Sequence, residues 1–204
     1  NFNKKKDLSK YTVLILGGST AQGLESKILK KYLDKALQKN TQIFNAAYGG
    51  YISTQELIVL TRFAKNLDPD LIININGAND IVHSIRPKNE PGTFFLSDTY
   101  KNFLSKPFSS IFLYLLQNSQ FYNGLLRLSA RNRIFNVNDY DSHLDIYLDN
   151  VESMYLYSKA IDAKYLNILQ PHIIFKNTKN EKEIEFKAFN YREEIIKKLY
   201  SKLQ

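Results

Sequence analysis

The sequence has 204 residues, of which 44% are hydrophobic, and this is enough apolar material for one domain with a real core. It contains no cysteine, which excludes disulfides and thiolate chemistry, and no apolar run reaches the roughly 18 residues that a membrane-spanning helix needs. The net charge of +8 favours contact with anionic polymers or anionic membrane surfaces, but the lysines are spread over predicted helix faces, and this distribution favours an ordinary solvated surface.

In the first 80 residues, apolar runs without a polar face alternate with stretches in which apolar residues recur at helical spacing. Ser53 and Glu56 have the spacing of a capping box, which predicts the start of a helix at Ser53. Strands that alternate with helices predict an α/β fold, with a doubly wound parallel sheet between two helical layers. The predicted order is strand 12–16, helix 23–39, strand 41–46, helix 53–67 and strand 71–76.

The second half of the chain interrupts this alternation. Residues 84–142 begin with a loop rich in proline and glycine and continue with short aromatic segments. They indicate either a helical insertion that flanks a site or an ordinary helical connection with its own core. After it we expect a helix at 144–161, a strand near 164–170 and an amphipathic helix at 189–204. The whole chain, 1–204, is interpreted as one domain.

Unusual residues follow three of the predicted strands. Gly17-Gly18-Ser19-Thr20 follows the first strand, Gly49-Gly50 the second, and Gly77-Ala78-Asn79-Asp80 the third. Ligands of parallel α/β sheets bind beyond the carboxyl ends of the strands, so these residues are expected to share one edge.

Together these residues suit acyl transfer. A serine at a tight strand-to-helix turn exposes its oxygen, and a helix N-terminus favours negative charge there. The oxyanion of the tetrahedral intermediate needs fixed donors, which the backbone N–H groups of Ser19 and Gly50 and the amide of Asn79 could supply. Each motif alone has a simpler interpretation: a βα loop or phosphate cradle at Ser19, a plain turn at Gly50, and a helix cap at Asn79.

The ordered set resembles the SGNH hydrolases, also called GDSL-type esterases and lipases. Gly17-Gly18-Ser19 matches their first block, "NAAYGG" with Gly50 their second, and "GAND" with Asn79 their third. The form "LGGSTAQG", with Gly18 in place of the usual Asp, and "LQP" at 169–171 resemble the branch common among bacterial envelope and surface-glycan esterases. The resemblance is close over 11–83 and loose over 160–204.

The resemblance implies a flavodoxin-like fold and a serine esterase that removes an O-acyl group, with O-acetyl on a carbohydrate favoured. It assigns Ser19 as the nucleophile, and Ser19, Gly50 and Asn79 as the oxyanion hole. Residues that could line the site are Gly18, Thr20, His83 and His172. It also favours a bacterial envelope or periplasmic location and a small-molecule or glycan ester as partner. No cofactor is expected, and no metal is implied because no cluster of His, Asp and Glu has the spacing of metal ligands.

The last block of the family, Asp-x-x-His after a fifth strand, has no counterpart in 1–204. His83 stands in the string "DIVH", but Asp80 belongs to the third block, so His83 is interpreted as a local polar residue. His143 follows the insertion, and His172 is expected near the active edge as a loop residue. We therefore expect a chain truncated before its catalytic base. Since residue 1 is Asn, we also expect a trimmed N-terminus, which leaves a lost signal peptide or membrane anchor open.

Other functions remain as alternatives. One is an acyltransferase on the same fold, and another is a glycan-binding or scaffolding domain that has lost its base. A third is a nucleotide- or nucleic-acid-binding protein, which is disfavoured because the sequence has neither G-x-G-x-x-G nor G-x-x-x-x-G-K-[ST]. No nucleic-acid partner is therefore expected.

Overall fold

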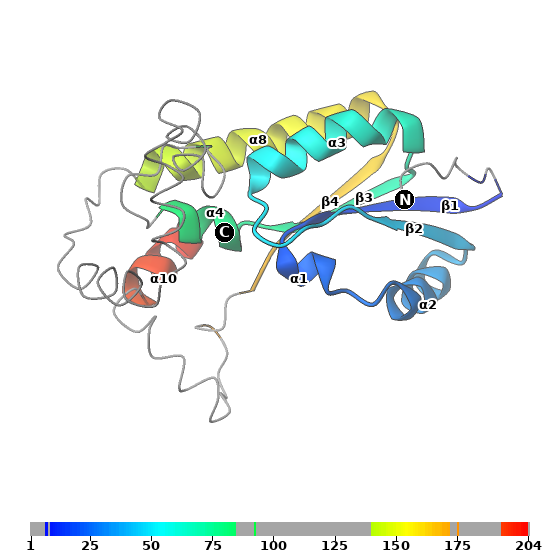
Figure 1. The fold of residues 1–204 in the computed structure, drawn as a ribbon, viewed down its shortest axis with the longest axis horizontal. Coiled ribbons are helices and arrows are strands. Elements are labelled where there is room, and N and C mark those ends of the chain that lie inside the picture. The colour runs from blue at the N-terminus through cyan, green and yellow to red at the C-terminus, as the bar shows by residue number, and fades with distance from the viewer. Residues whose placement is uncertain are drawn as a thin grey trace, which may run out of the picture.

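The computed structural model of the protein describes residues 7, 9–84, 92, 140–171, 175 and 193–203. Four strands in this part form one parallel sheet (Figure 1). The sheet has the order β2-β1-β3-β4. The strands are β1 (Tyr11–Gly17), β2 (Thr41–Asn45), β3 (Leu71–Asn76) and β4 (Lys164–Leu169). The predicted strands are confirmed, and most of the predicted insertion at 84–142 lies outside the described residues.

Helices cover both faces of the sheet, which confirms the predicted three-layer α/β architecture (Figure 1). Two short helices lie on one face, and two long helices lie side by side on the other. The remaining two lie beyond one end of the sheet. The first pair is α1 (Ser19–Gln22) and α2 (Ser26–Leu37), the second is α3 (Ser53–Leu67) and α8 (Tyr140–Ala160), and the third is α4 (Ala78–Ser84) and α10 (Glu193–Lys202).

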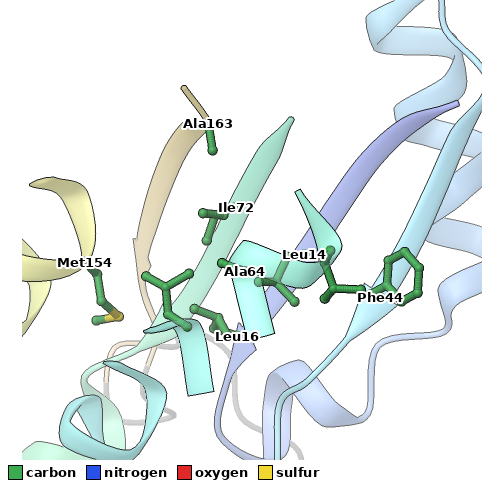
Figure 2. Close-up of a cluster of buried hydrophobic side chains, with 9 residues drawn as sticks. Leu14, Leu16, Phe44, Ala64, Ile72, Met154 and Ala163 are labelled. Atoms are coloured by element: carbon green, nitrogen blue, oxygen red, sulfur yellow. The ribbon is translucent and has the colours of Figure 1, made fainter. Parts of the chain in front are cut away.

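The central strand β1 is buried on both faces because its successive side chains point in opposite directions. Leu14 and Leu16 face α3 and α8 in a cluster that Figure 2 shows. Val13 and Ile15 face the other way, in a cluster with the leucines of α2 packed against it. An unbroken apolar run is what a strand covered on both faces requires.

The order of strands creates a switch point between β1 and β3. From β1 the chain crosses through α2 to β2 at one side, and from β2 it returns through α3 to β3 on the other side of β1. Neighbouring connections therefore leave β1 and β3 toward opposite faces, and the carboxyl ends of these two strands border a crevice. In sheets of this order ligands bind at that crevice.

Two helix predictions need correction. The helix predicted at 23–39 is two helices, because α1 ends at Gly23 and α2 begins after Glu25. The capping box at Ser53 and Glu56 is wrong: the N-cap is Ile52, whose N–H donates to Gln55 Oε1 at 3.2 Å. Ser53 and Glu56 both turn inward and are 1% exposed, so their polar groups serve the interior.

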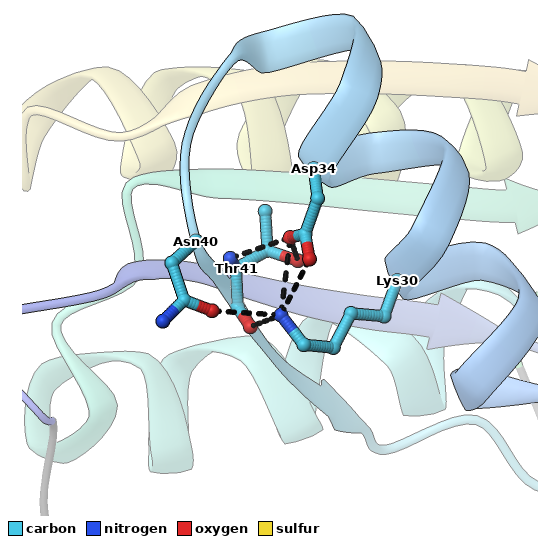
Figure 3. Close-up of polar contacts among 4 residues, drawn as sticks. All are labelled: Lys30, Asp34, Asn40 and Thr41. Carbon is cyan, nitrogen blue, oxygen red and sulfur yellow. Dashed lines mark hydrogen bonds and ion pairs between the residues drawn. The ribbon is translucent and has the colours of Figure 1, made fainter.

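The connection from α2 to β2 is fixed by partly buried polar contacts, which Figure 3 shows. Asp34 accepts hydrogen bonds from the Thr41 N–H at 2.7 Å and the Thr41 hydroxyl at 2.6 Å. Lys30 Nζ lies 2.8 Å from Asp34 Oδ2 and also donates to the Thr41 carbonyl at 2.7 Å. These bonds lower the pKa of Asp34 to about 2, with the bond from Lys30 contributing most.

Candidate active site

The three strand ends that carry unusual residues meet at the switch point. A Cβ added at Gly18 would lie 2.5 Å from Asn79 Nδ2, and a Cβ added at Gly49 would lie 3.9 Å from Ser19 Cβ. The first block therefore touches the third through Gly18 and the second through Ser19. The three blocks therefore lie next to one another at this edge of the sheet, as the sequence predicts.

Ser19 is exposed and is the first residue of α1, so its N–H has no acceptor within the helix. Thr20, beside it, is also exposed. The helix has only four residues. Its dipole is therefore small, and the expected electrostatic help from a helix N-terminus is not supplied by α1. Negative charge near Ser19 has to be stabilised by individual donors.

Gly50 lies in a tight turn that presents its N–H outward. The Tyr51 N–H donates to the Tyr48 carbonyl at 3.1 Å, and Gly50 has a φ of +83°. Type II turns require this left-handed conformation at their third residue, which explains the glycine. The Gly49 N–H is occupied by Gln22 Oε1 at 2.9 Å, whereas the Gly50 N–H has no partner among the described residues. No atom lies within 4 Å of a Cβ added at Gly50, so the space beside it is open.

Asn79 reaches the same place from α4. Its amide donates one hydrogen to the Tyr51 carbonyl at 2.7 Å, and a side-chain amide carries two. Because Gly18 has no side chain, the amide can approach the turn that carries Ser19. The lack of a side chain at position 18 thus has a steric reason in this chain.

The histidines are placed less favourably. His83 on α4 and His143 on α8 are both buried, at 6% and 7% exposed. His172 lies outside the described residues. The backbone two positions earlier is still at the carboxyl edge, because the Gln170 N–H donates to the Asn76 carbonyl at 2.7 Å. The identity of the base stays a prediction.

A buried polar network below this edge was not predicted from the sequence. Asn76 Nδ2 donates to Glu56 Oε2 at 2.8 Å, and the Tyr147 hydroxyl donates to Asn76 Oδ1 at 2.9 Å. Glu56 Oε1 is buried without a partner among the described residues. Burial, helped by the negative charge of Asp80, raises the pKa of Glu56 to about 8, so this carboxyl is neutral at pH 7. Burial also raises the pKa of Tyr147.

Asp80 is buried in the same part of the interior, but two groups of Ser53 donate hydrogen bonds to its carboxyl group. It accepts from the Ser53 hydroxyl at 2.6 Å and from the Ser53 N–H at 3.0 Å. Burial raises the pKa of Asp80, and the Ser53 bonds oppose that rise. The signal that could have indicated this role was the glycine-containing "GAND" motif, which places Asp80 beside Asn79.

An exposed serine, a turn with the Gly50 N–H and a side-chain amide thus share this edge of the sheet, and groups of these kinds can serve as a nucleophile and as donors to an anion. Among the described residues, no group of three or more His, Cys, Asp or Glu is arranged to hold a metal ion. In the same part of the chain, no helix has the length and apolar character needed to cross a membrane.

A cavity of about 690 Å³ opens at the other end of the sheet, where β1 and β4 begin. Its lining includes Tyr11, Lys39, Asp70, Lys159 and Lys164. Since Ser19 and Asn79 lie at the carboxyl ends of the strands, this cavity is separate from the site described above.

No protein-family model matches the chain, and no curated protein sequence matches it. Solved structures similar to it include TesA, with 18% identity, a TM-score of 0.42, and coverage of 90% of this chain and 74% of TesA. The psychrotrophic esterase EstA from Pseudoalteromonas sp. has 18% identity and a TM-score of 0.37 over 94% of this chain and 95% of EstA. AlinE4, described as an SGNH-hydrolase family esterase, has 15% identity and a TM-score of 0.37 over 93% and 96%.

Proposed function

We propose that this chain is a serine ester hydrolase of the SGNH type, with Ser19 as its nucleophile. The observation that carries the proposal is the convergence of Ser19, the Asn79 amide and a Gly50 N–H without a partner among the described residues, at the switch point between β1 and β3. The Ser19 N–H, the Gly50 N–H and the Asn79 amide form the oxyanion hole. Gly18 and Thr20 line the site.

In the reaction the Ser19 hydroxyl oxygen attacks the ester carbonyl carbon, and its proton passes to a general base. The carbonyl electron pair moves onto oxygen, where the three donors stabilise the charge that develops in the transition state. Collapse of the tetrahedral intermediate expels the alcohol, which takes the proton back from the base. Water then attacks the acyl-enzyme by the same steps and releases the acid.

The base is a histidine, since serine is a weak nucleophile without one. His172 is the candidate within this chain, because it follows Gln170 by two positions in the sequence, and the Gln170 N–H is bonded to the Asn76 carbonyl at the carboxyl edge. His83 and His143 are buried, which makes them weaker candidates for exchange of protons with an exposed serine.

The substrate we propose is a carbohydrate that carries an O-acetyl group. Tyr48 begins the Gly49-Gly50 turn and is 58% exposed, and its ring centroid lies 5.4 Å from that of Tyr51. A tyrosine ring exposed beside a nucleophile offers an apolar face to the C–H groups of a sugar ring, while its hydroxyl can bind sugar hydroxyls. The open space at Gly50 leaves room for a small acyl group.

Turnover of p-nitrophenyl acetate and of acetylated oligosaccharides by the wild-type protein and by Ser19→Ala tests the proposal. We expect activity that depends on Ser19, together with a phosphonate adduct on Ser19 detected by mass spectrometry. Tyr48→Ala is expected to raise KM for the oligosaccharide and to leave p-nitrophenyl acetate unaffected. Oligosaccharide binding without Ser19-dependent turnover would favour the non-catalytic glycan-binding function instead. A new sugar ester formed in place of free acetate would indicate an acyltransferase.

A further inference from the structure

A chain of hydrogen bonds joins three helices beneath the proposed oxyanion hole. Asn150 of α8 donates through Nδ2 to the Ser53 hydroxyl at 3.0 Å and to the Thr54 hydroxyl at 3.1 Å. The Ser53 hydroxyl in turn donates to Asp80 Oδ1 at 2.6 Å. Ser53 is 1% exposed and Asp80 is 7% exposed, so water does not compete for these bonds. The proposed reaction does not use any of these three side chains directly.

The direction of each bond follows from the chemistry of the groups. The amide nitrogen of Asn150 can only donate, and the Ser53 hydroxyl has one hydrogen and lone pairs that accept. If Ser53 accepts from Asn150, its hydrogen is available for Asp80, whose carboxyl group also accepts from the Ser53 N–H. Each bond along this chain then pairs one donor with one acceptor, and buried networks of such bonds restrict the motion of the elements that they join.

Ser53 and Asp80 are both next to residues of the proposed oxyanion hole. Asp80 follows Asn79 directly, so the bond from Ser53 fixes the start of α4. Ser53 is two residues after Tyr51, whose carbonyl accepts the Asn79 amide and whose N–H closes the Gly50 turn. A shift of α3 against α4 would therefore change the distance between the Asn79 amide and the Gly50 N–H.

We propose that Asn150, acting through Ser53 and Asp80, is a positioning residue that sets the geometry of the oxyanion hole. This inference rests on the proposed function, because it assumes that Asn79 and Gly50 bind the oxyanion. Asn150 belongs to none of the three motifs and lies on a helix that contributes no group to the reaction. Oxyanion donors work only within a narrow range of distance, so loss of the tie to α8 weakens them without removing them.

The test is a double-mutant cycle between Asn150→Ala and Asn79→Ala, with p-nitrophenyl acetate as the probe. We expect Asn150→Ala to lower kcat roughly tenfold with less than a twofold change in KM, and to have no further effect once Asn79 is alanine. The matched control is Tyr157→Phe, which removes another bond between α8 and α3, from the Tyr157 hydroxyl to the Thr61 carbonyl at 3.3 Å. That control is expected to leave kcat unchanged.

Equal losses of kcat for Asn150→Ala in both backgrounds would overturn the inference, because the effect would then bypass Asn79. An unchanged kcat in Asn150→Ala would overturn it as well. A second measurement is independent of turnover: ¹⁵N relaxation of the Gly50 N–H and of the Asn79 side-chain amide should show increased motion in Asn150→Ala and not in Tyr157→Phe. If wild-type turnover does not depend on Ser19, the proposed function fails, and relaxation alone decides whether Asn150 holds these two groups.

Discussion

Asp34 and Glu56 are carboxyl groups on opposite faces of one sheet, and their surroundings shift their pKa values in opposite directions. Asp34, on α2, has Lys30 and Thr41 as donors, and its pKa falls to about 2. Glu56, on α3, has Asn76 as its neutral donor and the charge of Asp80 nearby, and its pKa rises to about 8. The first carboxylate joins neighbouring elements at the surface. The second, Glu56, lies in the interior, where burial of a polar group costs free energy.

The difference between these two carboxyl groups indicates which part of the molecule carries the functional site. Groups with perturbed pKa values and incomplete hydrogen bonding gather at functional sites more often than elsewhere. Here they lie beneath the carboxyl ends of β3 and beside Asn79, while the α2 face is closed by apolar residues and satisfied ion pairs. Variants near the two carboxylates should therefore differ in kind: those beside Asn79 should alter turnover, and those around Asp34 should alter only stability.

The largest expected effect is that of Asn79→Ala. If the amide stabilises the oxyanion, kcat should fall roughly 100- to 1,000-fold with little change in KM, because the donor serves the transition state. If Asn79 were only a helix cap, its loss would cost about 1 kcal/mol of stability and leave kcat normal. Steady-state kinetics and thermal unfolding of the same preparation separate the two roles.

The next effect is that of Gly18→Ala. The φ of Gly18 is −86°, which alanine tolerates, but the added Cβ would lie 2.5 Å from Asn79 Nδ2 and must displace that amide. A displacement of this size is expected to lower kcat between about tenfold and 100-fold. Gly23→Ala is the matched control, since its φ is −76° and the nearest atom to an added Cβ is 3.4 Å away. Equal kcat values for the two variants would contradict the contact between the first and third blocks.

Glu56→Gln should change how stability depends on pH. The folded pKa of Glu56, about 8, is above its ordinary value of 4.5, so the folded state binds more protons than the unfolded state between these values. Wild-type stability therefore loses up to about 1.4 kcal/mol per pH unit as pH rises through this window. The glutamine variant has no such loss. Urea unfolding of both proteins between pH 5 and about 9 measures the difference in slope, and parallel curves would show that Glu56 is ionised in the fold.

Much of the fold was predictable because its signals are local. The strands at 41–46 and 71–76 and the helix at 53–67 follow from apolar periodicity and from turn residues, and so does the meeting of Ser19, Gly50 and Asn79 at one edge. The three glycine-containing motifs stand directly after strands, and in a parallel sheet the residues that follow the strands lie at the same edge.

The interior of the site was not predictable, because its contacts join distant residues. Asn150 and Ser53 are 97 positions apart, and Tyr147 and Asn76 are 71 positions apart. The capping-box pattern at Ser53 and Glu56 was misleading for the same reason: Asp80 and Asn76 recruit those two side chains into the core, and Gln55 takes the role of capping. Tertiary contacts override a local pattern when they satisfy the same polar groups better.

The smallest expected effect is that of Asp34→Asn on the exposed face. The pKa of Asp34 is lowered from 3.8 to about 2, so the stability that its charge contributes is present above pH 3.8 and is lost as the pH falls toward 2. The variant should therefore melt slightly below wild type at pH 7 and together with it near pH 2. Its kcat should be unchanged, because Lys30 and Thr41 touch no part of the site. Thermal unfolding at both pH values, with esterase assays at pH 7, gives the measurement. A loss of activity in Asp34→Asn with the melting temperature preserved would show that the two faces are coupled and would contradict their separation into stabilising and functional carboxylates.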